Sequence, residues 1–318
     1  MSDAAPSPFL FLVGCPRSGT TLLQRMLDSH GQLAVVNDSG FIYKSLKAVL
    51  PDWKRRLAEG DRLPLTPELV DYVRGHKRFK RLELDDAAVT AAATGAATWS
   101  EFVGRLYAAF ARRRGKRHGG EKTPDYVRRM PALHGMFPRA KFVHIIRDGR
   151  DVALSASAWA EPGNGPRRFE LFEEEPVATT AMWWAWQVSS GRRAGEQLGP
   201  EFYRELRYEQ LIDDPEGTLQ GLCEFLGLPF DPAMLRYHEG RASYEPRQSA
   251  KSAWLPPTRG LRDWRSQMAI EDVLAFESLA GELLGELGYE RTGESVPEPV
   301  ARKVERCRRW WHSESAGV

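Results

Sequence analysis

The stretch FLFLVGCPRSGTTLLQRML, residues 9–27, decides the fold of this chain. Its first five residues form a continuous apolar run that ends at Gly14, which is typical of a strand buried inside a parallel sheet. After the glycine-containing loop, apolar residues recur at helical spacing, namely at Leu22, Leu23, Met26 and Leu27. We therefore expect a strand, a loop and a helix in succession, with this first strand at the centre of the sheet.

The same succession recurs farther along the chain. KFVHII, residues 141–146, predicts a second buried strand, and DGRDVALSASAW after it predicts a helix. EFYRELRY, residues 201–208, alternates and predicts a third strand. A further helix should begin with Asp213 or Asp214 as its N-cap and stop at Gly227. These patterns predict an α/β fold of the P-loop type, in which helices flank a central, mostly parallel sheet in three layers.

The length of 318 residues suits a single domain over residues 1–318. Within it we expect a variable helical insertion at about 42–118 and a charged C-terminal tail at about 293–318. The segment 161–168 is rich in proline and glycine, and the segment 240–265 is rich in arginine, serine and proline, which indicates loops. The basic run at 112–120 is also expected to be a solvated loop.

Composition limits the partners of the chain. Lys and Arg number 45 against 43 Asp and Glu, so the formal charge of +2 predicts no nucleic-acid partner. Three scattered cysteines provide neither a disulfide framework nor a metal cage. No apolar run is long enough to span a membrane, and a cytoplasmic location is expected. The sequence leaves a homodimer open.

The loop itself has an unusual cation. Phosphate-binding loops of the pattern GxxxxGK[ST] cradle phosphates with backbone N–H groups and a lysine. Gly14 and Gly19 have this spacing, but Thr20 stands where the lysine belongs, and Arg17 supplies the positive charge instead. A simple glycine turn is the alternative. The missing lysine argues against a triphosphate-cleaving kinase, which also needs a magnesium ligand.

This loop resembles that of sulfotransferases that use 3′-phosphoadenosine 5′-phosphosulfate (PAPS), and in particular the bacterial enzymes similar to protein-tyrosine sulfotransferases. The resemblance implies transfer of a sulfuryl group to an acceptor hydroxyl on a peptide tyrosine, a carbohydrate, a lipid or a secondary metabolite. It also implies that no metal is required. The loop residues expected to hold the 5′-phosphate and the sulfuryl group are Arg17, Ser18, Gly19, Thr20 and Thr21.

A second block, FVHIIRDGRDVALSASAW, resembles the segment that binds the 3′-phosphate in this family. It places Arg147 at a strand end and Ser155 in the following helix, and a guanidinium with a hydroxyl suits a phosphate dianion. Alone, RDGRD would be a solvated turn. By the same resemblance Tyr208 lies near the nucleotide, unless it only anchors a strand end. Arg259 and Gly260 partly match the segment that clamps the 3′-phosphate in cytosolic relatives.

A third block, EKTP, makes Lys122 the lysine that stabilises charge on the leaving phosphate, although a lone lysine is by default a surface residue. Cytosolic relatives have a catalytic histidine two residues later, where this chain has Pro124. The family resemblance points instead to Asp38 as the base, with a role in a turn as the alternative. His30 is a second candidate for the base but is expected to be structural, and His144 is expected in the core.

Several tryptophans could line an acceptor pocket, although their helical spacing is more typical of a core. They are Trp159, Trp183, Trp184 and Trp186. Two rival functions remain, a P-loop small-molecule kinase and a non-catalytic nucleotide-binding protein. The first should carry a lysine at Thr20, and the second should have lost Arg17 or Lys122.

Overall fold

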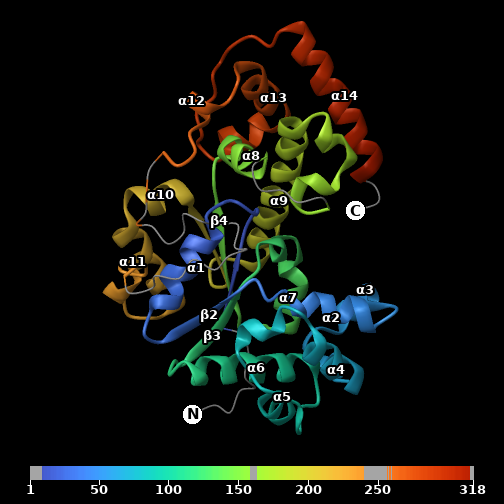
Figure 1. Cartoon of the computed structure of the whole chain (residues 1–318), viewed down its shortest axis with the longest axis vertical. Helices are drawn as coiled ribbons and strands as arrows, with labels where there is room; N and C mark the ends of the chain where they lie inside the picture. Colours follow the sequence, from blue (N-terminus) through green and yellow to red (C-terminus); the bar gives the residue numbers. More distant parts are fainter. Residues whose placement is uncertain (1–8, 158–162, 240–255, 257, 259, 316–318) are drawn as a thin grey trace.

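The computed structural model describes residues 9–157, 163–239, 256, 258 and 260–315 of the chain. A single parallel sheet runs through it in the strand order β2-β3-β1-β4-β5 (Figure 1). The strands are β1 (Leu10–Val13), β2 (Leu33–Asn37), β3 (His118–Lys122), β4 (Lys141–Ile146) and β5 (Tyr203–Arg207). The expected α/β class is confirmed, the first strand is central as predicted, and the sheet is parallel throughout.

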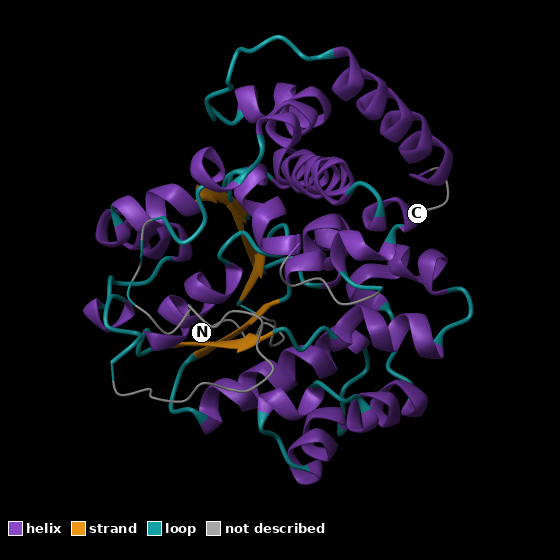
Figure 2. Ribbon diagram, turned by 45° about the horizontal axis from the view of Figure 1, so that its top comes forward, coloured by secondary structure: helices purple, strands orange, loops and turns teal. Residues whose placement is uncertain are grey.

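Helices cover the sheet and extend from both of its ends (Figures 1 and 2). In chain order the α-helices are α1 (Thr20–Ser29), α2 (Phe41–Val49), α3 (Trp53–Arg56), α4 (Pro67–Gly75), α5 (Asp86–Ala93), α6 (Trp99–Arg113), α7 (Met130–Met136), α8 (Gly149–Ser157), α9 (Pro176–Leu198), α10 (Tyr208–Asp213), α11 (Pro215–Leu226), α12 (Trp264–Gln267), α13 (Ile270–Glu286) and α14 (Glu298–Ser315). Short 3₁₀ helices include η2 (Phe79–Leu82) and η3 (Pro124–Arg129). Within the described ranges, none of the helices is both long and apolar enough to cross a bilayer.

The segment from 41 to 113 is mostly helical, and α14 lies in the tail. The predicted ends of α11 are confirmed. Asp214 is the N-cap of α11, since its side chain accepts a hydrogen bond from the Gly217 N–H, and Gly227 ends that helix in the left-handed conformation. The capping residues therefore set both ends of this helix, as the sequence indicates.

The prediction of a solvated loop over 112–120 is wrong. The start of this run belongs to α6, and its end is β3, an interior strand of the sheet. A Cβ at Gly119 would lie 2.2 Å from the Tyr107 carbonyl oxygen, and one at Gly120 would lie 2.8 Å from that of Leu10. The two glycines are therefore needed for close backbone packing, and they hide the strand from any search for apolar residues.

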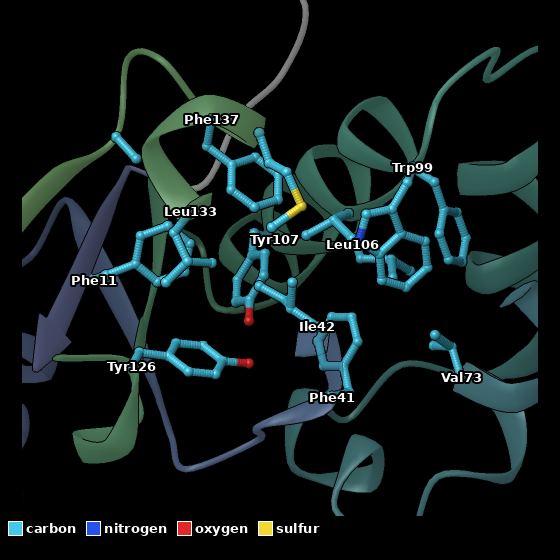
Figure 3. Close-up of a cluster of buried hydrophobic side chains, with 14 of the residues drawn as sticks. Phe11, Phe41, Ile42, Val73, Trp99, Leu106, Tyr107, Tyr126, Leu133 and Phe137 are labelled. Carbon is cyan, nitrogen blue, oxygen red and sulfur yellow. The ribbon is translucent and has the colours of Figure 1, made fainter. Parts of the chain in front are cut away.

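Alternation along β1 divides the core between the two faces of the sheet. Phe11 and Val13 pack in one cluster with α2, α6 and α7, whereas Leu10 and Leu12 pack in another with α1 and α11. Figure 3 shows the first cluster, in which Phe11 and Phe137 lie on the sheet side and Trp99 on the helical side. This packing joins the 41–113 segment to the central strand.

A buried ion network joins the loop after β4 to the C-terminal helices. The side chain of Arg150, which is fully buried, donates to Asp148 and to Glu277 of α13, with Nη1 2.7 Å from Glu277 Oε1. Its guanidinium carbon lies 3.6 Å from the centre of the Trp264 ring, and Nη2 donates to the Glu290 carbonyl. The opposite charges compensate a group that would be very costly to bury alone.

His144 lies inside β4 as expected, and it is fully buried. Its Nδ1 lies 2.7 Å from the Tyr203 hydroxyl. Burial, followed by the charge of Arg192, lowers the pKa of His144 from 6.5 to about 3. The folded state therefore keeps this ring neutral at a pH where the unfolded chain protonates it.

This shift predicts how stability depends on pH. Because the folded pKa is depressed, stability is complete above about pH 6.5 and falls as the pH decreases towards 3, by about 1.4 kcal/mol per pH unit. The free energy of unfolding in urea, measured at pH 7.5 and pH 5, should fall less in His144→Gln than in wild type. Equal losses in the two proteins would contradict the assignment.

Candidate functional site

The residues singled out in the sequence gather at one edge of the sheet, where the parallel strands end. The loop of residues 14–19 follows β1, Lys122 ends β3 and Asp38 follows β2. Arg147 directly follows β4, and Tyr208 directly follows β5. Open α/β sheets bind their ligands at this carboxyl edge. Chain segments far apart in sequence therefore form one candidate site around the loop.

The phosphate loop adopts a conformation that requires its glycines. Gly19 has φ 84° and precedes α1, and a Cβ there would lie 2.3 Å from Cδ2 of the Tyr208 ring. A Cβ at Gly14 would lie 2.5 Å from the Ile145 carbonyl oxygen. Arg17, at the loop tip, also has a positive φ of 78°. The backbone therefore wraps tightly around the N-terminus of α1, where free N–H groups favour an anion.

Arg17 contacts α8, the helix within the second sequence block. Its Nε donates to Ser155 Oγ of α8 at 2.9 Å. Burial, followed by the positive charges of Arg147 and Arg262, lowers the pKa of Arg17 to about 10. Ser155 was expected to act together with Arg147, and in the structure its hydroxyl accepts a hydrogen bond from Arg17. Arg17 therefore lies in a site with an excess of positive charge.

Arg147 lies over the ring of Tyr208, with its guanidinium carbon 4.4 Å from the ring centre. Its Nη2 forms an ion pair of 3.1 Å with Asp151 Oδ2. Among the described residues, Arg147 Nε and Ser18 Oγ are buried polar atoms without a hydrogen-bond partner. Both atoms can donate a hydrogen bond, so both are suited to a ligand with acceptor oxygens.

Lys122 is almost completely buried at the end of β3. Its Nζ lies 3.4 Å from Oγ1 of Thr21, the second threonine of the loop. Burial lowers the pKa of Lys122 to about 8, which the nearby charge of Asp38 partly opposes. The lysine is therefore held next to the N-terminus of α1 and is not the surface residue that a lone lysine usually is.

Asp38 lies in the left-handed region, with φ 53°, in the turn after β2. Its backbone N–H donates to the Lys122 carbonyl, which ties the turn to the end of β3. Arg78 Nη1 donates to Asp38 Oδ2 at 2.8 Å, and Arg81 Nη1 lies 3.6 Å from the same oxygen. Two arginines of the helical segment therefore orient the carboxylate, and these contacts were not predicted.

A second carboxylate, also missed in the sequence, lies near this turn. Asp125 is exposed, three residues after Lys122, and its Oδ1 accepts a hydrogen bond of 3.1 Å from Gln187. Burial lowers the pKa of Lys44, and the charges of Asp38 and Asp125 both oppose that shift. Lys44 therefore lies near both carboxylates. Only its position three residues after the lysine could have drawn attention to Asp125.

Other sequence candidates lie elsewhere or outside the described residues. Gly260 is exposed, and a Cβ there would meet nothing within 4 Å. His30 Nε2 lies 2.9 Å from the Pro229 carbonyl oxygen, and His30 Nδ1 accepts a hydrogen bond of 3.0 Å from the Gln32 N–H. Both ring nitrogens therefore have partners within the fold, which fits a structural role. Arg259 and Trp159 fall outside the residues that the structure describes.

The three tryptophans of α9 differ in how deeply they are buried. Trp183 and Trp184 are fully buried in the core beside α8 and α13, as helical spacing suggested. Trp186 is only partly buried, and the Arg128 guanidinium carbon lies 4.1 Å from its ring centre. Of these three, only Trp186 remains near enough to the surface to meet an acceptor.

The fold and the site together define a phosphate-loop group transferase that lacks the lysine of triphosphate-cleaving enzymes. Comparison with known proteins specifies the family. The model described as "Sulfotransferase family" matches residues 8–232, and the chain belongs to that family. Membership confirms the predicted enzyme class and, at the level of the family, the predicted use of PAPS as the sulfuryl donor.

The individual relatives have low sequence identity to this chain but match most of its length. The chain is 25% identical to nodulation protein NoeE of Sinorhizobium fredii over 352 residues, which covers 97% of this chain and 75% of that protein. It is 26% identical to protein-tyrosine sulfotransferase A of Caenorhabditis elegans, covering 94% and 73%. The sulfotransferase domain from the curacin biosynthetic pathway has a similar fold, with a TM-score of 0.61, 21% identity, and coverage of 91% and 100%.

Proposed function

We propose that this enzyme transfers the sulfuryl group of PAPS to an acceptor hydroxyl by in-line displacement. The observation that carries the proposal is a set of three cations, the partly buried Arg17 and the buried Lys122 and Arg147, around a helix N-terminus at the carboxyl edge of the sheet. Buried positive charge of this kind is stabilised by a polyanionic ligand.

The site has separate places for the two ends of such a donor. The loop N–H groups, the Ser18 hydroxyl and Arg17 would hold the 5′-phosphosulfate, and Ser18 Oγ is buried without a partner in the described structure. Arg147 would hold the 3′-phosphate, for which its Nε is available. Its Nη2 is already oriented by Asp151. The residues present therefore fit the donor.

Sulfuryl transfer resembles phosphoryl transfer, in which catalysis consists mainly of positioning and of stabilising charge on the departing oxygen. Lys122 and Arg17 would neutralise that charge, with Thr20 and Thr21 as additional donors. Asp38 would accept the proton of the attacking hydroxyl. Its ion pairs with Arg78 and Arg81 hold the carboxylate in a fixed orientation at the site.

The acceptor is a hydroxyl compound whose class we propose to be set by the segment 41–113, because η2 of that segment contacts Asp38 directly. Peptide tyrosines, carbohydrates, lipid alcohols and phenolic metabolites are all acceptors to test. Such variable segments commonly determine specificity on a shared scaffold.

The preference for a nucleotide with a 3′-phosphate over one without it tests the donor assignment. Wild type should bind 3′-phosphoadenosine 5′-phosphate (PAP) much more tightly than adenosine 5′-phosphate in calorimetry. Arg147→Ala should lose about 10- to 100-fold in affinity for PAP, since one charge-assisted contact is lost. Its affinity for adenosine 5′-phosphate should change little.

The exposed Arg193→Ala is a matched control that should keep the preference for PAP. Equal affinity of wild type for the two nucleotides would refute the assignment of Arg147 to the 3′-phosphate.

A further inference from the structure

Glu121 is a fully buried carboxylate immediately before Lys122, and no step of the proposed reaction uses it. It lies in β3 opposite Phe11 of β1, whereas Lys122 lies opposite Leu12. Since neighbouring strand residues point to opposite faces, Glu121 faces α6 and Lys122 faces α1. The carboxylate therefore does not contact the lysine amine but lies directly behind the end of the strand that carries it.

Four donors converge on this carboxylate. Oε1 accepts hydrogen bonds from Ser39 Oγ at 2.7 Å, from the Gly40 N–H at 2.7 Å and from Thr123 Oγ1 at 2.5 Å. Oε2 accepts one from the Tyr107 hydroxyl of α6, whose ring packs in the core cluster of Figure 3. Burial raises the pKa of Glu121, and these four hydrogen bonds oppose that shift because they favour the ionised carboxylate.

Two of these donors belong to the turn that presents Asp38. Ser39 and Gly40 follow Asp38 directly, and the Asp38 N–H binds the Lys122 carbonyl from the other side. Thr123, a third donor, follows Lys122 directly. Glu121 therefore joins the turn after β2 to the end of β3. It thereby links Asp38, the proposed base, to Lys122, the lysine proposed to stabilise the leaving phosphate.

The charge of Glu121 also reaches the lysine. Burial lowers the pKa of Lys122 to about 8, and the negative charges of Asp38 and Glu121 oppose this shift. Arg81 and Arg78 act in the opposite direction. Near Glu121 itself, the phenols of Tyr107 and Tyr126 remain neutral, because burial and the nearby carboxylate raise their pKa values.

We propose that Glu121 is a positioning residue of the sulfuryl-transfer site, which fixes the Asp38 turn against β3 and places a carboxylate behind Lys122. This inference rests on the proposed function, because it assigns Lys122 to the donor phosphate. It predicts that the two effects of Glu121, on geometry and on charge, can be separated by different substitutions.

Glu121→Gln removes the charge and leaves most of the geometry. The glutamine oxygen can keep the three donors that converge on Oε1, and the Tyr107 hydroxyl can turn to accept from the new amide. PAP affinity, measured by calorimetry from pH 6.5 to 9.5, should weaken at alkaline pH in wild type as Lys122 deprotonates. We call this loss of affinity at high pH the alkaline limb. In Glu121→Gln the alkaline limb should shift to lower pH by about 0.5 to 1 unit.

Tyr107→Phe is the matched control, because it removes one hydrogen bond to Glu121 and keeps the charge. Its alkaline limb should coincide with that of wild type. An unshifted limb in a folded Glu121→Gln protein, with only a loss of stability in urea, would reduce Glu121 to a structural residue and overturn the proposal.

Ser39→Ala provides a second test that does not depend on the folding of Glu121→Gln. It loosens the Asp38 turn and retains the charge, so turnover should fall about fivefold with the alkaline limb unchanged. Wild-type turnover in Ser39→Ala would overturn the geometric half of the proposal. Absence of PAP binding by wild type at every pH would instead refute the donor assignment itself, and the role of Glu121 with it.

Discussion

Replacement of Asp38 by asparagine is expected to lower kcat by about 10²- to 10⁴-fold, the usual contribution of a general base. Asparagine has the same shape but cannot accept the proton of the attacking hydroxyl. PAP affinity should be nearly unchanged, since the donor is held by the loop and Arg147. The measurement is PAP formation with the best acceptor from a panel of phenols, carbohydrates and lipid alcohols.

The ion pairs of Asp38 require a control, because Asp38→Asn also weakens the contacts with Arg78 and Arg81. Arg78→Ala removes one partner and keeps the carboxylate, so it should cost much less activity. Asp125→Asn tests the second carboxylate beside Lys44. If Asp125→Asn abolishes turnover while Asp38→Asn remains active, the base is Asp125.

Lys122→Ala should lower kcat by about 10²- to 10³-fold, as expected when one group that stabilises developing charge is removed from a buried site. The amine is almost fully buried and adjacent to Thr21, so water cannot easily replace it. The readout is again PAP formation, with PAP affinity determined separately below pH 8.

Lys141→Ala is a suitable comparison for Lys122→Ala. Lys141 begins β4, which is separated from β3 by β1, and donates to the Phe225 carbonyl at the opposite edge of the sheet. It should retain turnover after correction for any loss of stability. Equal activity losses in the two variants would show that the effect of Lys122→Ala is not specific to the site.

The sequence could predict the parts of the fold that depend on local apolar patterns. The runs at β1 and β4 and the capped helix α11 lie where their patterns indicate. β3 could not be found in this way, because its sequence HGGEK has glycines required by packing against Tyr107 and Leu10. Its last two residues, Glu121 and Lys122, are charged and therefore add nothing to an apolar pattern.

The site was predictable where a motif carries its own chemistry and not where chain segments meet only in the folded protein. The loop arginine and the lysine of EKTP lie at the expected edge of the sheet. The partners of Asp38 could not be predicted, since Arg78 is 40 residues away in a helical segment without a recognisable pattern. The pairing of Arg17 with Ser155 likewise spans 138 residues.

The buried Arg150 network limits how far the segment that matches the family can be separated from the C-terminal helices. Arg150 and Asp148 lie within the segment that matches the family, residues 8–232, but Glu277 and Trp264 lie beyond it. A chain shortened to the matched segment would keep the whole phosphate loop but would lose Glu277 and Trp264, two partners of Arg150, and would uncover the core around Trp184 that α13 packs against. Donor sites exchanged between relatives of this enzyme must therefore bring their C-terminal helices with them.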